Sequence, residues 1–296
     1  MQGLLLALSA YIIWGCFPLF FNLLSHVPSL EVLANRIVWS VVATLLLILL
    51  LGKRNQLLEV LKNRQLMPWL ALTSVLISAN WLLFIWAVTQ HRVMEASLGY
   101  YMTPLISLLL ARLLLKEALH PLQAVAGALA TVAVVWELYS LGSLPWISLT
   151  LALTFGFYGL VRKRYPVDGL CGLTVEASLV LPIALLWLLW QFWSPTQNLL
   201  FGETTDTTLL LIASGIMTAI PLLLFAAAAK RLDLSVVGFI MYINPTLQFL
   251  IAVFIFKEDF PPQRVVTFVL IWTALVLFMW GMWQARKAQQ QAVELG

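Results

Sequence analysis

The stretch YYMTPLISLLLARLLLKEALHP at residues 100–121 recurs as MYINPTLQFLIAVFIFKEDFPP at residues 241–262. The same offset of 141 residues aligns the apolar triplet at 82–84 with the triplet at 223–225. Self-similarity at one fixed spacing indicates an internal repeat. The shared positions are Tyr101 with Tyr242, Pro104 with Pro245, Lys116-Glu117 with Lys257-Glu258, and Pro121 with Pro262.

The composition of the chain is that of a membrane protein. Of its 296 residues, 62% are hydrophobic and 10% are charged, and the mean hydropathy is +0.95. So few charges cannot cover a water-soluble surface. Long, continuous Leu-rich runs predict helices that cross a hydrocarbon layer about 30 Å thick, whereas a membrane barrel would show shorter, alternating segments. We therefore predict an all-α polytopic membrane protein.

Apolar runs separated by polar and Pro/Gly breaks predict ten transmembrane helices. Thirteen of the 17 Lys and Arg residues fall on the side of the N-terminus, three (Arg92, Lys257 and Arg264) fall on the opposite side, and Arg36 lies inside a span. Because Lys and Arg accumulate in cytoplasmic loops, both termini are expected to be cytoplasmic. The expected spans lie near residues 3–24, 31–51, 66–89, 94–115, 121–139, 143–161, 171–193, 208–229, 234–256 and 263–283.

Five spans in each half return the chain on the opposite side of the membrane, so the second half must be inverted. The expected architecture is two inverted five-helix repeats, at residues 1–141 and 142–285, followed by a short cytoplasmic tail at residues 286–296. Two inverted halves can exchange their roles, which is the physical basis of alternating access.

Two prolines lie about ten residues into their predicted spans. Pro104 and Pro245 each remove a backbone hydrogen bond, and the freed carbonyl groups must be satisfied by other helices, side chains or cavity water. Thr103 and Asn244 directly precede them. A proline can also bend a helix simply for packing, but its duplication at equivalent depth favours the lining of a cavity.

Charged side chains inside the apolar spans are few: Arg36, Glu95, Glu137 and Glu176. Each is expensive in a membrane, by about 2.5 to 3.5 kcal/mol even on the lower insertion scales. Arg36 requires a carboxylate, and its depth favours Glu95 or Glu31, of which we expect Glu95. A structural ion pair or snorkelling to the interface is the expected role of Arg36 and Glu31. Glu95 and Glu176 remain open between structural anchors and substrate or proton sites.

A set of polar and aromatic residues is a further candidate for cavity lining. Asn80 lies inside an otherwise apolar span, and Tyr101 and Tyr242 are paired by the repeat. A tyrosine beside a proline kink offers an apolar ring and one hydroxyl, which suits an amphipathic organic solute better than a bare ion. Other Trp residues, including Trp146 and Trp190, fit an interfacial belt. The expected cavity set is Tyr11, Trp14, Asn80, Trp81, Tyr101, Thr103, Tyr158, Tyr242 and Asn244.

Several chemistries are not supported by any motif. The sequence contains no phosphate-binding GxxxxGK[ST] loop, no HExxH and no GxSxG, and its three His residues fall at loops or helix ends. Cys16 and Cys171 form no CxxC pair. We therefore expect no cofactor, no metal site and no enzyme activity. The basic residues lie between apolar segments, where membrane orientation explains them better than nucleic-acid binding.

Four segments carry a resemblance to a known family: NWLLFIWAV at 80–88, EASLGY at 95–100, GSLP at 142–145 and FYGLVRK at 157–163. They resemble the EamA branch of the drug/metabolite transporter superfamily, over nearly the whole chain. The resemblance implies ten helices in two inverted repeats and a central cavity lined mainly by helices one, three, four, six, eight and nine. It also implies export or exchange of small organic solutes across the bacterial inner membrane. One departure is the Asn-Pro at 244–245, which stands as Thr-Pro at 103–104.

These observations predict a secondary transporter for a small organic solute. The solute is expected between Tyr101, Asn80, Tyr242 and Asn244, with Glu95 or Glu176 as proton carrier if transport is coupled. The expected partners are a small-molecule substrate and membrane lipid, with no nucleic acid, and the protein is expected to be a monomer or weak dimer. The alternatives are a membrane-embedded enzyme acting on a lipid-like substrate, and a non-transporting sensor with a transporter fold.

Overall fold

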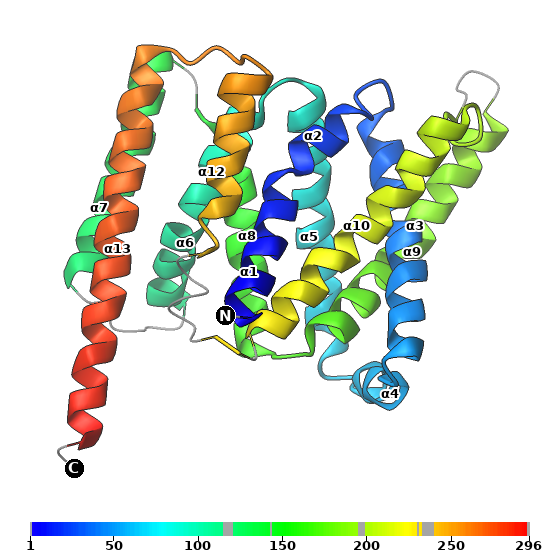
Figure 1. Cartoon of the computed structure of the whole chain (residues 1–296), viewed down its shortest axis with the longest axis horizontal. Coiled ribbons are helices and arrows are strands. Elements are labelled where there is room, and N and C mark those ends of the chain that lie inside the picture. The colour runs from blue at the N-terminus through cyan, green and yellow to red at the C-terminus, as the bar shows by residue number, and fades with distance from the viewer. Residues whose placement is uncertain are drawn as a thin grey trace.

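The computed structural model describes residues 2–114, 121–142, 144–194, 199–229, 231–232 and 240–294. In these residues the regular elements are helices, and the only pairing of the strand type is an isolated bridge between Phe201 and Thr204. In Figure 1, α7 and α13 stand side by side at one end of the bundle, and α3, α9 and α10 lie at the other. The start of α1 and the C-terminal end of α13 lie at the lower end of this view, as does α4.

The helices follow one another along the chain with short connections. Their bounds are α1 (Gln2–Gly15), α2 (Phe17–Asn22), α3 (Ser29–Leu50), α4 (Arg54–Lys62), α5 (Met67–Thr89), α6 (Val93–Leu114), α7 (Pro121–Leu141), α8 (Trp146–Arg164), α9 (Gly169–Trp193), α10 (Thr205–Ala229), α12 (Ile243–Leu250), the π-helix η1 (Ile251–Ile255) and α13 (Pro262–Glu294).

Eight helical segments of the described chain are long and apolar enough to cross a membrane. They are α1 together with α2, then α3, α5, α6, α7, α9, α10 and α13. The predicted span at 143–161 corresponds to α8, whose last turn carries Arg162, Lys163 and Arg164. The predicted span at 234–256 corresponds in part to the shorter apolar helix Ile243–Ile255, and residues 233–239 lie outside the described residues. The prediction of an all-helical, multi-pass membrane protein is confirmed.

One helix was not predicted. The sequence analysis assigned no element to residues 52–65, but α4 forms there, and none of its residues is buried. Its nine residues are too few to span a membrane, so a search for long apolar runs does not find it.

Close contacts between helices position the interior. α6 packs on α8, α7 on α13, α1 on α10, and α3 on both α9 and α10. A Cβ atom at Gly99 of α6 would lie 2.8 Å from the carbonyl oxygen of Ser148 on α8. One at Gly215 of α10 would lie 2.5 Å from the backbone nitrogen of Ser40 on α3. Small residues at such contacts let two backbones approach closely, which is how membrane helices gain packing energy.

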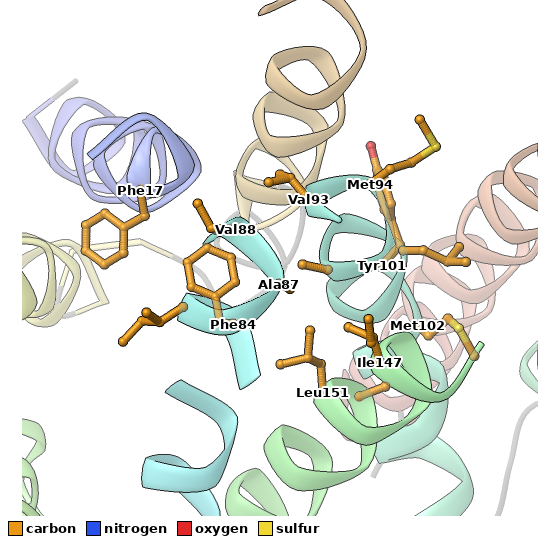
Figure 2. Close-up of a cluster of buried hydrophobic side chains, with 14 of the residues drawn as sticks. Phe17, Phe84, Ala87, Val88, Val93, Met94, Tyr101, Met102, Ile147 and Leu151 are labelled. Carbon is orange, nitrogen blue, oxygen red and sulfur yellow. The ribbon is translucent and has the colours of Figure 1, made fainter. Parts of the chain in front are cut away.

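A buried apolar cluster joins α2, α5, α6 and α8 in Figure 2, with Phe17, Phe84, Met94 and Leu151 among its members. Large apolar side chains also face outward, among them Trp193, which is 79% exposed. This distribution is expected where lipid, and not water, surrounds the helices. The cluster fixes α5, α6 and α8 against one another, and these three helices carry most of the predicted site.

Candidate functional site

The two repeated prolines lie in helices that touch. α6 contains Pro104 and packs against α12, which contains Pro245. The hydroxyl of Ser97 donates a hydrogen bond of 2.9 Å to the carbonyl oxygen of Pro245. The hydroxyl oxygens of Tyr101 and Thr246 are 2.7 Å apart. Pro104 lies inside α6, whereas Pro245 lies in the first turn of α12. Tyr101 is buried, so these two proline-containing helices form a closed, hydrogen-bonded contact in this structure.

The residues that precede the prolines are held within their own helices. Thr103 Oγ1 donates to the carbonyl oxygen of Gly99 at 3.1 Å, and Asn244 Oδ1 accepts from Gln248 Nε2 at 2.8 Å. Tyr242 is half-buried and packs against the main apolar cluster. These side chains therefore stabilise the local shape of α6 and α12.

Asn80 ties three helices together. Its Nδ2 group donates to the carbonyl oxygen of Leu151 at 3.0 Å and to Thr154 Oγ1 at 2.9 Å, both on α8. Its Oδ1 accepts from the hydroxyl of Tyr100 on α6 at 3.2 Å. Asn80 is fully buried. The polar residue that stood out in an apolar span thus has satisfied partners, as buried amides require.

The rest of the predicted cavity set falls into separate places. Tyr11 and Trp14 of α1 pack together, with ring centroids 5.4 Å apart, and both contact Phe225 of α10. Within the described part of the chain, no hydrogen bond or ring contact joins Asn80 to Tyr101, or either of them to Tyr242. In this structure the three residues belong to separate sets of contacts, and a solute position between them stays a prediction.

Glu176 and Tyr158 do meet. One carboxylate oxygen of Glu176 accepts from Thr73 at 2.7 Å, and the other accepts from the Tyr158 hydroxyl at 3.3 Å. Arg162 Nη1 lies 3.6 Å from the same carboxylate, which is fully buried. This cluster joins α5, α8 and α9 through one buried carboxylate and a cation.

Arg36 lies about 10 Å along α3 from Ser29, at 1.5 Å of rise per residue. It is only 3% exposed. Its Nε group donates to Thr218 Oγ1 on α10 at 3.0 Å. Its Cζ atom lies 4.3 Å from the ring centroid of Trp81 and 5.2 Å from that of Phe21. Nη1 is buried and has no hydrogen-bond partner among the residues that the structure describes.

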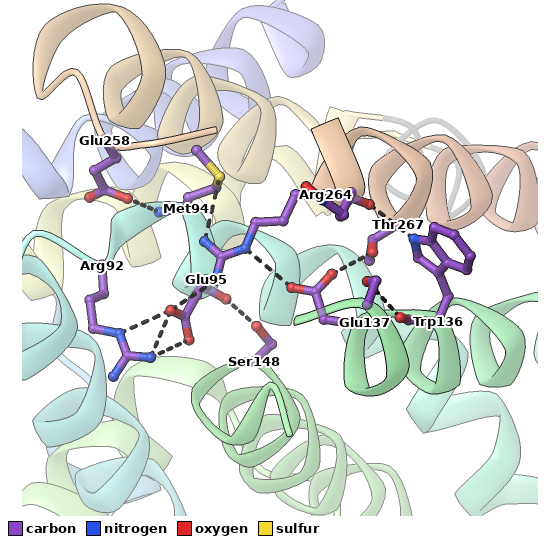
Figure 3. A network of polar contacts seen from close by, with 11 residues as sticks. Arg92, Met94, Glu95, Trp136, Glu137, Ser148, Glu258, Arg264 and Thr267 are labelled. Carbon is purple, nitrogen blue, oxygen red and sulfur yellow. Dashed lines mark hydrogen bonds and ion pairs between the residues drawn. The ribbon is translucent and has the colours of Figure 1, made fainter. Parts of the chain in front are cut away.

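A second arginine, which is partly buried, has the opposite environment (Figure 3). Arg264 of α13 contacts two carboxylates: its Nη2 lies 3.3 Å from Glu95 Oε1 and its Nε lies 3.2 Å from Glu137 Oε1. Arg92 binds both oxygens of Glu95, at 2.9 and 3.0 Å. Thr267 donates to the other oxygen of Glu137. This network joins the start of α6, the last turns of α7 and the start of α13.

The predicted pairing of Arg36 with Glu95 is therefore wrong. Glu95 lies in the first turn of α6. Arg92 directly precedes this helix, three residues before Glu95, and pairs with it. Arg264 reaches the same carboxylate from α13. Depth alone could have suggested Arg264, because the sequence places it on the same side of the membrane, but depth does not specify which helix faces which.

The Lys-Glu pair of the second repeat has a structural role. Glu258 accepts hydrogen bonds from the backbone nitrogens of Val93, at 2.6 Å, and Met94, at 2.8 Å, at the start of α6. A carboxylate at a helix N-terminus satisfies free N–H groups. Burial raises the pKa of the Glu258 carboxyl, and these two hydrogen bonds act in the opposite direction. The matching pair at 116–117 lies outside the described residues.

A more exposed ion pair joins the segment that follows α3 to the residue that precedes α9. Lys53 Nζ lies 2.7 Å from Asp168 Oδ2, and Asp168 also accepts from the backbone nitrogen of Cys171 at 3.2 Å. Burial alone would raise the pKa of the Asp168 carboxyl, but the hydrogen bonds from Lys53 and Cys171 outweigh it and lower the pKa.

Comparison with known proteins identifies the family. The family described as EamA-like transporters matches residues 1–138. Protein RarD of Salmonella typhimurium is 44% identical over 279 residues, which cover 94% of this chain and 94% of RarD. The chain belongs to the EamA-like transporter family. The predicted resemblance to the EamA branch of the drug/metabolite transporter superfamily is thereby confirmed.

Other EamA-like relatives agree with this assignment. The chloramphenicol-sensitive protein RarD of Pseudomonas aeruginosa is 34% identical over 295 residues, covering 98% of this chain and 97% of the relative. An uncharacterized transporter of Vibrio cholerae is 42% identical over 277 residues, covering 94% and 91%. One crystal structure aligns with a TM-score of 0.60 at 19% identity, covering 93% of this chain and 96% of the other, and supports the fold alone.

This EamA-like chain also contains a cavity of about 960 Å³ between α3, α5, α8 and α9. Glu31 and Gln191 are among the residues that line the cavity. The carboxylate of Glu31 accepts a hydrogen bond from the backbone nitrogen of Phe201 at 2.9 Å. From the sequence, Trp146 and Trp190 are expected in an interfacial belt, whereas the structure places both in the lining of this cavity. Residues on different helices are far apart in the sequence, so no sequence pattern shows that they line one cavity together. The aromatic lining comprises Trp86, Trp146, Trp187 and Trp190.

No candidate metal centre emerges from the geometry. In the portion of the chain covered by the structure, no three His, Cys, Asp or Glu residues gather at one place.

Proposed function

We propose that this protein is a secondary transporter that moves a small organic solute across the bacterial inner membrane by alternating access. Its ten spans would form two inverted halves, with α8 and the segment containing α12 and η1 completing the second half. Membership of the EamA-like transporter family supports the general activity.

The packing of the helices supports the two-halves arrangement. If the second half repeats the first, α1 corresponds to α8, α3 to α9, α5 to α10, α6 to α12, and α7 to α13. The contact of α1 with α10 then has its equivalent in that of α8 with α5, and the contact of α6 with α8 in that of α12 with α1. The pairs α3 with α9, α6 with α12 and α7 with α13 are each their own equivalent, and all three are in contact.

The observation that carries the proposal is the direct contact of α6 and α12, the two helices that contain the repeated prolines, one from each half. The bond from Ser97 to Pro245 and the contact of Tyr101 with Thr246 close this junction. Both involve hydroxyl groups, which can exchange partners with a solute or water at little cost. Opening here would create a cavity bordered by Tyr242 and Asn244, where the sequence analysis expects the solute.

The orientation of the chain follows from its charges. Arg162, Lys163 and Arg164 end α8, and Lys53 precedes α4, at the end of the bundle where α1 starts. Basic residues favour the cytoplasmic side, so we place both termini in the cytoplasm. Labelling of single cysteines at Gly52 and Gly202, in a background lacking Cys16 and Cys171, tests this: only the cysteine at Gly202 should react with an impermeant reagent in whole cells.

Transport itself is tested in two steps. A thermal-shift screen of the purified protein against amino acids, nucleosides, amphenicols and cationic dyes identifies a ligand, because binding to the folded state alone stabilises it. Uptake of that ligand into proteoliposomes should then saturate with concentration and be lost in Tyr242→Ala. Tyr139→Ala is the matched control, because Tyr139 is 84% exposed on α7. Equal uptake by both variants and the unmodified protein would remove the cavity assignment.

A further inference from the structure

The transport scheme gives no role to Arg36, a buried cation on α3. A guanidinium group carries five N–H donors in a planar fork that matches a carboxylate or phosphate. Here the structure satisfies Nε through Thr218, while Nη1 is buried with no partner. No described carboxylate lies within ion-pair distance of Arg36, so the charge is not neutralised by the part of the chain that the structure covers.

The environment of Arg36 stabilises a cation without neutralising it. Trp81, Phe21 and Phe17 place their rings 4.3, 5.2 and 5.7 Å from its Cζ atom. Aromatic faces attract a guanidinium through their quadrupole, but they leave its N–H groups without acceptors. The protein therefore holds a desolvated positive charge with one buried donor, Nη1, that has no described partner, which is costly unless something else supplies the negative charge.

The same residues lead to the predicted cavity. Phe21, whose ring faces Arg36, begins a chain of ring contacts that ends at Tyr100, and the Tyr100 hydroxyl donates to Asn80. The ring of Phe84 lies 5.8 Å from that of Tyr100 and 6.1 Å from that of Phe21. An apolar and aromatic wall thus runs from Arg36 to the helix that carries Pro104.

We propose that Arg36 binds the negatively charged group of the transported solute, and that the solute is a small organic anion with an apolar or aromatic body. This inference rests on the proposed transport function and names its substrate class. A carboxylate or similar group would accept from Nη1, and the body of the solute would pack on the rings around Trp81. The guanidinium rests on the aromatic rings when the solute is absent.

Comparison with two partly buried arginines supports this assignment. Arg264 contacts Glu95 and Glu137, and Arg162 contacts Glu176. Each of these two has a carboxylate supplied by the chain itself. Among the residues that the structure describes, Arg36 contacts a hydroxyl and aromatic rings but no carboxylate, so it keeps an unneutralised charge and, at Nη1, a donor without a partner.

The test compares four probes of one size on the purified protein: benzoate and benzenesulfonate as anions, benzamide as a neutral analogue, and benzylammonium as a cation. We expect a saturable rise in melting temperature with the anions alone. Arg36→Met should abolish the rise, and Arg36→Lys should weaken apparent affinity about tenfold, because lysine keeps the charge but loses the planar fork. Arg64→Met, at an exposed arginine, is the matched control and should keep the full response.

Three results would overturn the inference: an equal shift with benzamide, no saturable shift with either anion, or an unchanged anion response in Arg36→Met. Uptake of benzenesulfonate into proteoliposomes separates this inference from the transport function. Saturable uptake of a neutral or cationic solute that persists in Arg36→Met would leave transport standing and remove the anion site. Anion binding that depends on Arg36, without uptake of any solute, would overturn the transport function alone.

Discussion

Arg36 is buried and Arg264 is partly buried, with a side chain that is 21% exposed, and their surroundings differ in one decisive respect. Arg264 lies between two carboxylates that belong to α6 and α7, and its network also includes Arg92 and Thr267. Arg36 lies between α3 and α10 with one hydroxyl acceptor and a wall of aromatic rings.

This difference distinguishes Arg264, which stabilises the fold through ion pairs, from Arg36, which we propose binds an anionic solute. A buried ion pair that is broken leaves an uncompensated charge, so the residues of the Arg264 network depend on one another. Arg36 has no described carboxylate that depends on it. Removing Arg264 should therefore damage the folded protein, whereas removing Arg36 should damage only what binds there.

The largest effect is expected at Arg264. Arg264→Met leaves Glu137 buried with only Thr267 as partner, and should lower the free energy of unfolding by about 3 to 5 kcal/mol. Thermal unfolding in detergent, followed by tryptophan fluorescence, measures the loss. Arg64→Met controls for the removal of a positive charge from an exposed position. Equal melting temperatures for the two variants would contradict a structural role for Arg264.

A second substitution should restore part of this loss. In Arg264→Met with Glu137→Gln, the unpaired carboxylate becomes a neutral amide, so we expect about 1 to 3 kcal/mol of recovery relative to Arg264→Met alone. The same melting experiment on the two single variants and the double variant gives the coupling energy. Strictly additive losses would show that the two residues do not act as a pair.

The effect at Arg36 should be smaller and opposite in sign. Arg36→Met removes an unneutralised charge and keeps an unbranched side chain that can pack on Trp81 and Phe21. We expect a rise of about 1 kcal/mol in the ligand-free protein, in line with other replacements of buried charges by apolar residues. A fall as large as that of Arg264→Met would place Arg36 in the structural class and break the comparison.

The smallest effect is expected at the partly exposed pair of Lys53 and Asp168, whose side chains are 27% and 22% exposed. The pKa of Asp168 is lowered from its ordinary value of 3.8 in the folded state. Its contribution is therefore present above about pH 4 and is lost as the pH falls through the lower, folded-state pKa. We expect about 0.5 to 1 kcal/mol at neutral pH, allowing for solvent screening. Melting curves of Asp168→Asn and the unmodified protein should differ at pH 7 and converge towards pH 3.

Much of the fold could be predicted from single residues and their spacing. The long apolar runs that end near Leu50, Thr89 and Trp193 correspond to α3, α5 and α9 within a few residues. Continuous apolar helices are unambiguous in a membrane, because every backbone group must be satisfied inside its own segment. α4 was missed for the same reason: it does not cross the membrane and gives no long apolar signal.

The sites were less predictable than the helices. Asn80 and Glu176 stand out because polar groups are costly in apolar spans, and Tyr101 stands out because the repeat pairs it with Tyr242. All three have hydrogen-bond partners in the structure. The predicted partner of Arg36 is wrong. The sequence favours an ion pair or snorkelling to the interface for Arg36, whereas the structure buries it with no described carboxylate beside it. Depth in the membrane is readable from position along a helix, but the direction in which a side chain points across the bundle is not.

The sequence alone determined that this protein is helical, spans a membrane several times and carries a repeat with a period of 141 residues, because composition and spacing are local properties of the chain. Only the tertiary structure decided that Arg264 and not Arg36 receives the carboxylates of α6 and α7, and that Trp81 faces Arg36. Such partners depend on how each helix is rotated and which neighbour it contacts. Close packing at residues such as Gly99 and Gly215, summed over the whole bundle, sets that rotation.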